Sequence, residues 1–569
     1  MPASETVVFT GGTIRPLDGR IARAEALAVR DGRVLSYGSR AQVRAQAGAG
    51  ATTVELDGAS LLPGLVDTHP HVLHFGAFEH PLVRLWDAKD WGEIIARLRA
   101  RAETLPPGTW LMGTPVGEPH YFIRRSWRDL AERTLPDRTA LDRASTRHPV
   151  MIQAWAPVIP NVCAFNSAAL AALGISRTTP DRAENVWIEK DVHGDPTGRL
   201  HGSVNNYYTN DPFMNELLRK VPLLQPEAVL PGTIAAMTRY NQMGITTVYE
   251  GHAMGAPEIA AWRALSARDA LTLRVLTTPD CESYGLPWSK RLSDDEFRVR
   301  LEKALAGVDT SGQTFRQGGV TLSRGGPCWP GFLRRHEPYR GPYGELTNGV
   351  TFVSEEREQA AIDFCARTGL RLGFVGAGDR DHDEFLANAE IANDRMPGST
   401  RGWILQHVFF LTERQAARYA ALGIEVTTSL SFSWGKGELF RQRIGDHVLA
   451  DLIPLQRMLE AGLPVACGSD WGPKNVFEQI QLALTHEFAG SGWRNDGPAQ
   501  RVSRENALAM WTHAAARILR WEQVGTLEPG AHADLIVVDR DPLTCPLEDL
   551  PATRVLRTLF GGRVVHDAL

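Results

Sequence analysis

The feature that most constrains this fold is a long alternation of apolar β-type runs with helical stretches, from about residue 61 to residue 522. Strands that alternate with helices in this way pair in parallel, because each helix carries the chain back along the sheet. Eight runs qualify as strands, which is the number that a closed (β/α)8 barrel needs. The predicted strands are Gly64–Asp67, Ile245–Tyr249, Leu273–Thr277, Val320–Leu322, Arg371–Val375, Trp403–Gln406, Ile424–Thr428 and Pro464–Cys467.

The interval between the first and second predicted strands, residues 73–240, is too long for one connection and contains helical stretches of its own. We expect it to form an inserted subdomain or lid above the barrel mouth. Short β-type segments with turn residues occupy both ends of the chain, including an Asp31-Gly32 hairpin signal. Since each end alone is too small to bury a core, we predict one composite β-sandwich made of residues 1–61 and 525–569, with the barrel spanning residues 62–524.

Composition excludes several classes of function. With 569 residues and a formal net charge of −5, the chain has no basic excess of the kind that a phosphate backbone attracts. It shows no secretory signal and no apolar run near the roughly 18 residues of a membrane span. The six cysteines stand singly, which is typical of reduced thiols. We therefore expect a cytoplasmic protein with a small-molecule substrate and no nucleic-acid or membrane partner. A homodimer is one possible oligomeric state.

Two histidines follow the first predicted strand, in the run Asp67-Thr68-His69-Pro70-His71. Residues two apart on a strand face the same side, so His69 and His71 are expected to project together. Neutral imidazole nitrogens bind Zn²⁺ and similar ions, which makes this pair a candidate for the start of a metal site. On its own, such a pair is more often a structural contact than a metal site.

A carboxylate among small residues, Asp470 in Gly468-Ser469-Asp470, follows the eighth predicted strand. The carboxyl ends of barrel strands form the face on which catalytic groups collect. Asp470 there would bind the metal and accept a proton from activated water. The alternative is an aspartate that forms a turn or caps a helix.

Longer motifs resemble those of the amidohydrolase superfamily, and more narrowly those of amidohydrolase family 3, the branch that includes N-substituted formamide deformylases. The runs that carry the resemblance are 62–71, 166–170, 244–248, 378–380, 468–470 and 524–535. The resemblance covers nearly the whole chain. It implies a TIM barrel with a composite β-sandwich, and attack of metal-activated water on an amide or related C–N bond.

The sequence departs from the family pattern at two ligand positions. The fourth strand of the family commonly carries a bridging lysine and the fifth a histidine, where this chain has Thr321 and Val375. The histidine of the sixth strand is present as His407. We therefore expect one divalent ion, zinc first with manganese or iron as alternatives, held by His69, His71, His407 and Asp470.

The second predicted strand offers replacement groups, because period-two alternation places Glu250 and His252 on one face. They would complete a mononuclear site or act on the substrate as acid and base, and a salt-bridged loop pair is the alternative. Weaker candidates for substrate contacts are His201 and Arg324, which stand beside glycines. Trp471, with Trp434 and Trp329, would add an aromatic wall for an apolar substrate.

The function favoured by these residues is hydrolysis of an amide or an N-acyl or N-formyl compound at one divalent metal. A second hypothesis keeps the metal but changes the reaction to that of a lyase, hydratase, decarboxylase or isomerase, since a fold does not fix a function. A third is a metal-free binding protein that has lost catalysis.

Overall fold

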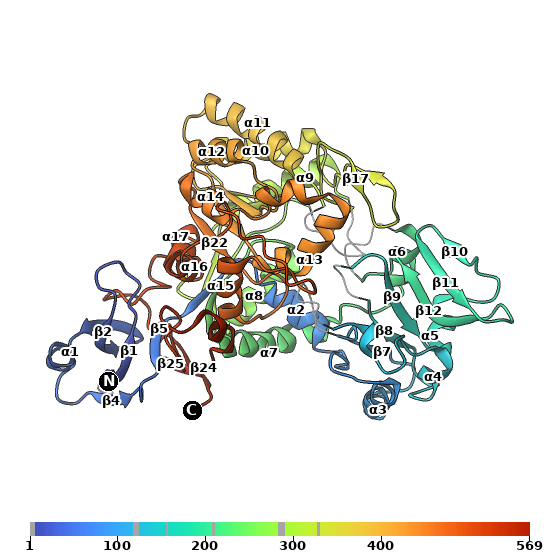
Figure 1. The fold of residues 1–569 in the computed structure, drawn as a ribbon, viewed down its shortest axis with the longest axis horizontal. Coiled ribbons are helices and arrows are strands. Elements are labelled where there is room, and N and C mark those ends of the chain that lie inside the picture. The colour runs from blue at the N-terminus through green and yellow to red at the C-terminus, as the bar shows by residue number, and fades with distance from the viewer. Residues whose placement is uncertain (1–5, 118–124, 155–157, 207–210, 283–290, 327–330) are drawn as a thin grey trace.

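The computed structural model describes residues 6–117, 125–154, 158–206, 211–282, 291–326 and 331–569 (Figure 1). Each of the eight predicted strands is present, with ends that differ from the expected ones by at most one residue. They are β6 (Leu65–Asp67), β13 (Ile245–Glu250), β14 (Arg274–Thr277), β16 (Val320–Ser323), β19 (Leu372–Gly376), β20 (Ile404–His407), β21 (Glu425–Thr428) and β22 (Val465–Cys467).

These strands form two parallel sheets, in the orders β15-β14-β13-β6 and β16-β19-β20-β21-β22, where β15 spans Phe315–Gln317. Backbone hydrogen bonds join the sheets beyond their strand ends. On one side Cys281 N donates to Thr321 O at 2.7 Å, and on the other Thr68 N donates to Cys467 O at 3.4 Å. The eight strands thus follow one another in chain order, as the (β/α)8 prediction requires, while full closure of the barrel stays a prediction.

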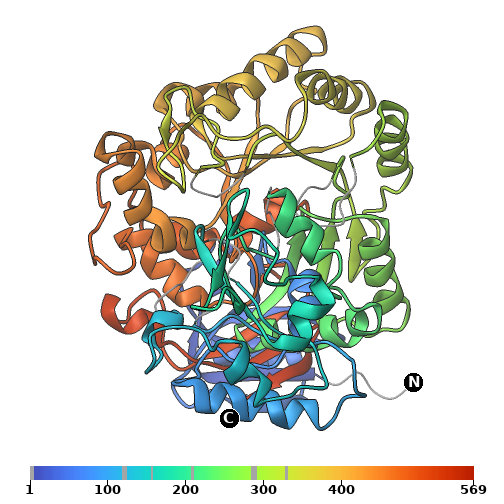
Figure 2. The same cartoon turned by 90° about the vertical axis from the view of Figure 1, so that its right-hand side faces the viewer.

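Helices lie around the outside of these strands (Figure 2). Many begin at a residue whose side chain accepts from the first turn, such as Ser293, Ser354 and Thr412. The helices are α7 (Val229–Gln242), α8 (Ala256–Ala267), α9 (Asp294–Ala306), α10 (Glu355–Thr368), α11 (Asp379–Arg395), α12 (Glu413–Ala421), α13 (Leu430–Arg443), α14 (Leu455–Glu460), α15 (Val476–Thr485), α16 (Arg504–Ala509) and α17 (His513–Ile518). In the described part of the chain, no helix has the length and apolar character that crossing a bilayer needs.

The interval after β6 contains a six-stranded sheet, in the order β10-β11-β12-β9-β8-β7, and apolar clusters separate from the barrel core. It begins and ends at α2 (Val72–Glu79) and α7, which pack so closely that a Cβ on Gly76 would lie 2.3 Å from Gly232 O. The interval therefore has its own sheet and core, and its action as a lid stays a prediction. Its strands are β7 (Leu111–Gly113), β8 (Val150–Ile152), β9 (Asn161–Phe165), β10 (Arg182–Ala183), β11 (Val186–Lys190) and β12 (Pro196–Gly202), and its helices α3 (Trp91–Ala102), α4 (Arg138–Asp142), α5 (Ser167–Leu173) and α6 (Pro212–Leu218).

Strands from both ends of the chain form one mixed sheet, in the order β25-β24-β23-β5-β1-β2-β3, with β4 paired to β1. The blue and dark red strands lie side by side in Figure 1 because β5 pairs with β23. The predicted Asp31-Gly32 hairpin connects β2 to β3. The two-layered sandwich and the domain boundaries stay predictions. The strands are β1 (Thr6–Ile14), β2 (Ala24–Arg30), β3 (Arg33–Gly38), β4 (Thr52–Glu55), β5 (Ser60–Pro63), β23 (Leu535–Val538), β24 (Val555–Phe560) and β25 (Arg563–Asp567), and α1 spans Arg40–Ala47.

Candidate metal centre

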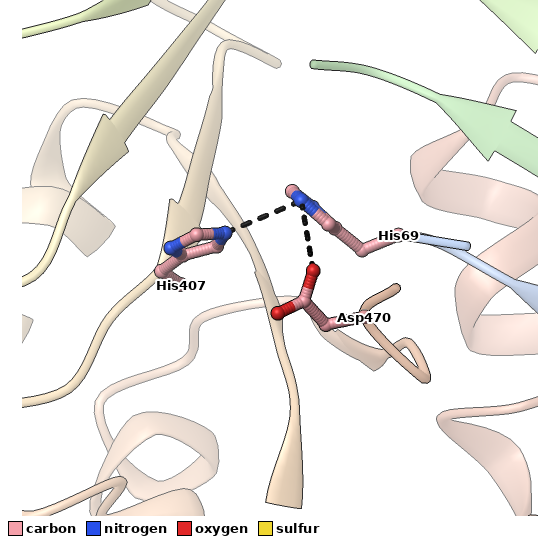
Figure 3. Close-up of side chains that lie close together, drawn as sticks. All are labelled: His69, His407 and Asp470. Atoms are coloured by element: carbon pink, nitrogen blue, oxygen red, sulfur yellow. Dashed lines mark hydrogen bonds and ion pairs between the residues drawn. The ribbon is translucent and has the colours of Figure 1, made fainter. Parts of the chain in front are cut away.

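Three of the predicted ligands meet at the carboxyl ends of the parallel strands (Figure 3). Within the described residues, the ligand atoms of His69, His407 and Asp470 all lie within 4.8 Å of one another, and all three side chains are buried. His69 Nε2 is 3.2 Å from His407 Nε2 and 3.9 Å from Asp470 Oδ1. The structure therefore brings His69 together with two predicted ligands that follow it by more than 300 positions in the chain.

His71 contacts the same carboxylate, since its Nε2 lies 3.3 Å from Asp470 Oδ1. Its ring centroid is 4.9 Å from that of His69. Metal–ligand bonds of roughly 2.0–2.2 Å place two ligands of one tetrahedral zinc ion about 3.3 Å apart. The separations of 3.2 Å between His69 and His407 and of 3.3 Å between His71 and Asp470 are close to this value. The group within 4.8 Å consists of His69, His407 and Asp470, with His71 beside it.

The backbone at the site adopts conformations that residues other than glycine rarely take. The φ angles of His71, His407 and Asp470 are 55°, 76° and 50°, in the left-handed region. Such residues persist only where the surrounding structure holds them, and they cluster at active sites. These left-handed conformations could not be predicted from residue type, because none of the three is a glycine or an asparagine.

Neighbouring groups hold the Asp470 loop in place. The buried Lys474 Nζ donates to Ser469 O at 2.7 Å and also to Asp470 O. The Oδ1 atom of Asp67 accepts from both His69 N and Ser469 N at 3.0 Å, which ties the end of β6 to the segment after β22. Asp67 and Lys474 were missed as site residues. The signal was available, since both stand within four positions of a predicted ligand.

The electrostatics of the group favour a cation. Burial lowers the pKa of His69 and His71, and that of His407 to about 3, so the imidazoles are neutral and keep a lone pair for a metal. Burial alone would raise the pKa of Asp470, but the hydrogen bond with His71 and the nearby imidazoles hold it below its usual value. Neutral imidazoles beside an ionised carboxylate are a suitable donor set for a divalent ion.

Glu250 ends β13 and binds the backbone of another element. Its Oε1 accepts from Leu73 N at 3.3 Å in the first turn of α2, where the N-cap residue His71 makes no side-chain capping bond. Burial raises the pKa of Glu250 to about 8. Glu250 thus caps the helix that follows His71, and its predicted contact with the metal stays a prediction.

His252 lies beside the predicted ligands. Its ring centroid is 5.8 Å from that of His69, 5.7 Å from that of His71 and 6.2 Å from that of His407. The position of the family lysine is occupied by Thr321, whose hydroxyl donates to Gly251 O at 2.6 Å. The segment directly after β13 therefore brings an imidazole to the site, and its predicted contact with the substrate stays a prediction.

The three weaker candidates have different surroundings. Trp471 lies at the site, with its ring centroid 5.4 Å from that of His71. His201 Nε2 instead contacts Glu189 Oε2 at 2.9 Å in the inserted sheet. Arg324 forms ion pairs with two carboxylates, at 2.9 Å to Glu358 and 2.6 Å to Glu384. The geometry thus gives His201 and Arg324 structural partners and no support for a contact with substrate. Trp329 lies outside the described residues.

Comparison with known proteins decides the family. The model of the amidohydrolase family matches residues 52–566. The chain belongs to the amidohydrolase family. Among its relatives, N-substituted formamide deformylase of Arthrobacter pascens is 26% identical over 100% of this chain and 99% of its own, and Protein LONG AFTER FAR-RED 3 of Arabidopsis thaliana is 23% identical over 98% and 91%. An uncharacterized metal-dependent hydrolase of Pyrococcus horikoshii has the same fold, with a TM-score of 0.70 and 18% identity over 96% of this chain and 99% of that one.

Proposed function

We propose that this amidohydrolase-family protein is a metal-dependent hydrolase that cleaves the C–N bond of an amide or of an N-acyl or N-formyl compound. The observation that carries the proposal is the buried group of His69, His407 and Asp470, with its atoms at ion-binding distances. Full-length similarity to an N-substituted formamide deformylase supports the N-formyl class. The ion is zinc in this proposal, with manganese and iron as alternatives.

The residues of the site would have two roles, metal binding and proton acceptance. His69, His407 and Asp470 would hold the ion with His71 beside them, and a bound divalent ion supplies polarisation of the carbonyl and activation of water. Asp470 Oδ2 has no hydrogen-bond partner among the residues that the structure describes, whereas Oδ1 faces the histidines. Oδ2 is therefore available to accept the proton that the attacking water loses.

Aromatic rings flank the group and favour an apolar substituent on the substrate. Trp471 stacks on Phe78, with centroids 6.0 Å apart, next to His71. Phe432 lies 5.0 Å from the ring of His407 on another element, α13. Such rings bury an alkyl or aryl group while the polar atoms of the amide face the ligands.

Product analysis tests the proposal. Zinc-loaded protein should convert N-benzylformamide to formate and benzylamine, and Asp470→Asn, which keeps size but removes the charge, should lose at least about a hundredfold in turnover. Release of a product with no water added would favour a lyase or isomerase. Tight substrate binding without turnover in the zinc-loaded protein would favour the binding-protein hypothesis.

A further inference from the structure

A second carboxylate, that of Asp280, lies beside the imidazole of His252. Its Oδ2 is 3.7 Å from His252 Nδ1, and both side chains are buried. This separation is an ion-pair distance and is too long for a neutral hydrogen bond. No motif pointed to Asp280, which follows Pro279 in the segment after β14.

The structure fixes Asp280 from several directions. Its backbone N donates to Met254 O at 2.8 Å, and the residue forms a parallel bridge with Thr321 at the start of β16. Oδ2 accepts from Ala253 N at 2.9 Å, and Ala253 is in the left-handed region with φ of 60°. The chain therefore turns directly after His252 in a way that keeps the imidazole beside this carboxylate.

The second carboxylate oxygen of Asp280 lacks a hydrogen-bond donor. Oδ1 is buried and makes no hydrogen bond to any residue within the described ranges. A buried carboxylate oxygen without a donor is unfavourable, and His252 Nδ1, which is 3.7 Å from Oδ2, can supply an N–H to this carboxylate after a small rotation. An ionised carboxylate only accepts, so it selects the His252 tautomer with the hydrogen on Nδ1.

Fixing the Nδ1 hydrogen has a consequence for the other ring nitrogen. Nε2 lies on the opposite edge of the imidazole from Nδ1, so it is turned away from Asp280 and carries a lone pair. The rings of His69, His71 and His407 are 5.7–6.2 Å from that of His252, so His252 lies at the edge of the ligand group. Nε2 is then an acceptor at the place where the substrate amide would lie.

We propose that Asp280 is a positioning residue that fixes His252 as a hydrogen-bond acceptor for the substrate N–H, and that the enzyme therefore selects secondary amides over N,N-disubstituted ones. The inference rests on the proposed C–N hydrolysis. A site built to pair with an N–H group rejects an analogue that lacks it, because its own polar group is then left unpaired.

Matched substrates test the selection. We expect the wild-type protein to show at least about a tenfold higher kcat/KM for N-benzylformamide than for N-benzyl-N-methylformamide. Asp280→Ala should bring this ratio close to one, mostly by lowering kcat/KM for the secondary amide. Asp280→Asn tests the same contact with little change in packing and should lower the ratio as well. Because both substrates meet the same pocket in each variant, the extra methyl group alone cannot explain a change in the ratio.

Glu258 supplies a matched control. Its Oε1 lies 3.9 Å from His74 Nε2, a carboxylate–imidazole pair of similar separation at the start of α8. Glu258→Gln should leave the substrate ratio unchanged. Zinc content should also stay at the wild-type level in Asp280→Ala, and loss of zinc there would overturn the inference by making His252 a ligand.

A measurement without turnover separates this inference from the proposed function. Nitrogen-15 spectra of histidine-labelled, zinc-loaded protein should show the His252 hydrogen on Nδ1, and this signature should change in Asp280→Asn. Wild-type protein that hydrolyses neither amide contradicts the proposed function. Hydrolysis with an unchanged ratio in both Asp280 variants, or a hydrogen on Nε2 in the wild type, contradicts the inference alone.

Discussion

A buried ion pair, Arg274 with Asp534, links the parallel strands to the sheet formed by the chain ends. Arg274 begins β14 and Asp534 directly precedes β23, and their side chains are 3% and 1% exposed. Nε donates to Oδ2 at 2.6 Å and a terminal guanidinium nitrogen donates to Oδ1 at 3.0 Å. Oδ1 also accepts from Gly561 N at 2.7 Å. The pair is thus bidentate and shielded from water.

We expect Asp534→Ala to destabilise the protein by about 3–5 kcal/mol, because removing one partner leaves a buried, uncompensated charge. Arg274 would keep only its bond to Gln313 O, and Gly561 N would lose its acceptor. The double variant Arg274→Met/Asp534→Leu should recover most of the loss, since an apolar pair of similar volume leaves no charge buried.

Urea unfolding of the wild type, both single variants and the double variant measures the coupling between the two residues. The control is Asp567→Ala, which removes the partner of Arg557 on the same sheet, where the side chains are 22% and 44% exposed. That change should shift the free energy of unfolding by no more than about 1 kcal/mol. A loss below about 1 kcal/mol in Asp534→Ala, or additive effects in the double variant, would refute the reasoning.

Three further predictions concern the site and the stability of the fold. Elemental analysis should find about one divalent ion per chain and almost none in His69→Ala, whereas two ions per chain would contradict the missing-ligand argument. Glu250→Gln keeps an acceptor for Leu73 N but removes the carboxyl group that a bound cation would ionise, so metal affinity should fall at least about tenfold. Wild-type affinity would restrict the role of Glu250 to capping α2. Burial lowers the pKa of His486 from 6.5 to about 4, so its contribution to stability is complete above pH 6.5 and is lost as the pH falls towards 4. The free energy of unfolding of wild-type protein should fall by about 2 kcal/mol more between pH 8 and pH 5 than that of His486→Asn. Equal slopes of melting temperature against pH in the two proteins would count against this.

The strands were predictable because their signal is local. Each is a short apolar run bounded by turn residues, and burial on both faces requires such a run in a parallel sheet. Some ends are shifted by one residue, because hydrogen bonds to neighbouring strands determine where each strand begins and ends. Glu250 illustrates this, because the predicted strand ended at Tyr249 whereas β13 ends at Glu250.

The site was predictable only where a motif supplied long-range information. His69, His407 and Asp470 could be placed together because the family pattern links them, whereas spacing alone could not. Arg324 shows the limit of local reasoning. A glycine-flanked arginine at a strand end resembles a substrate contact, but Glu358 and Glu384, on the two helices that follow in the chain, form ion pairs with it.

Three buried side chains around the site, which we call its supports, explain how the ligands keep ion-binding distances although their backbone is strained. Asp67 joins the segments of His69 and Asp470, Lys474 binds the carbonyls of the Asp470 loop, and Glu250 caps the helix after His71. Each support comes from an ionisable side chain that is itself buried, so releasing a ligand would also expose or unpair that polar group. The ligands are therefore held before an ion arrives, and binding requires little rearrangement of the protein. A site of this kind should bind its metal with high affinity and lose that affinity when a support is changed, even though the ligands stay in place.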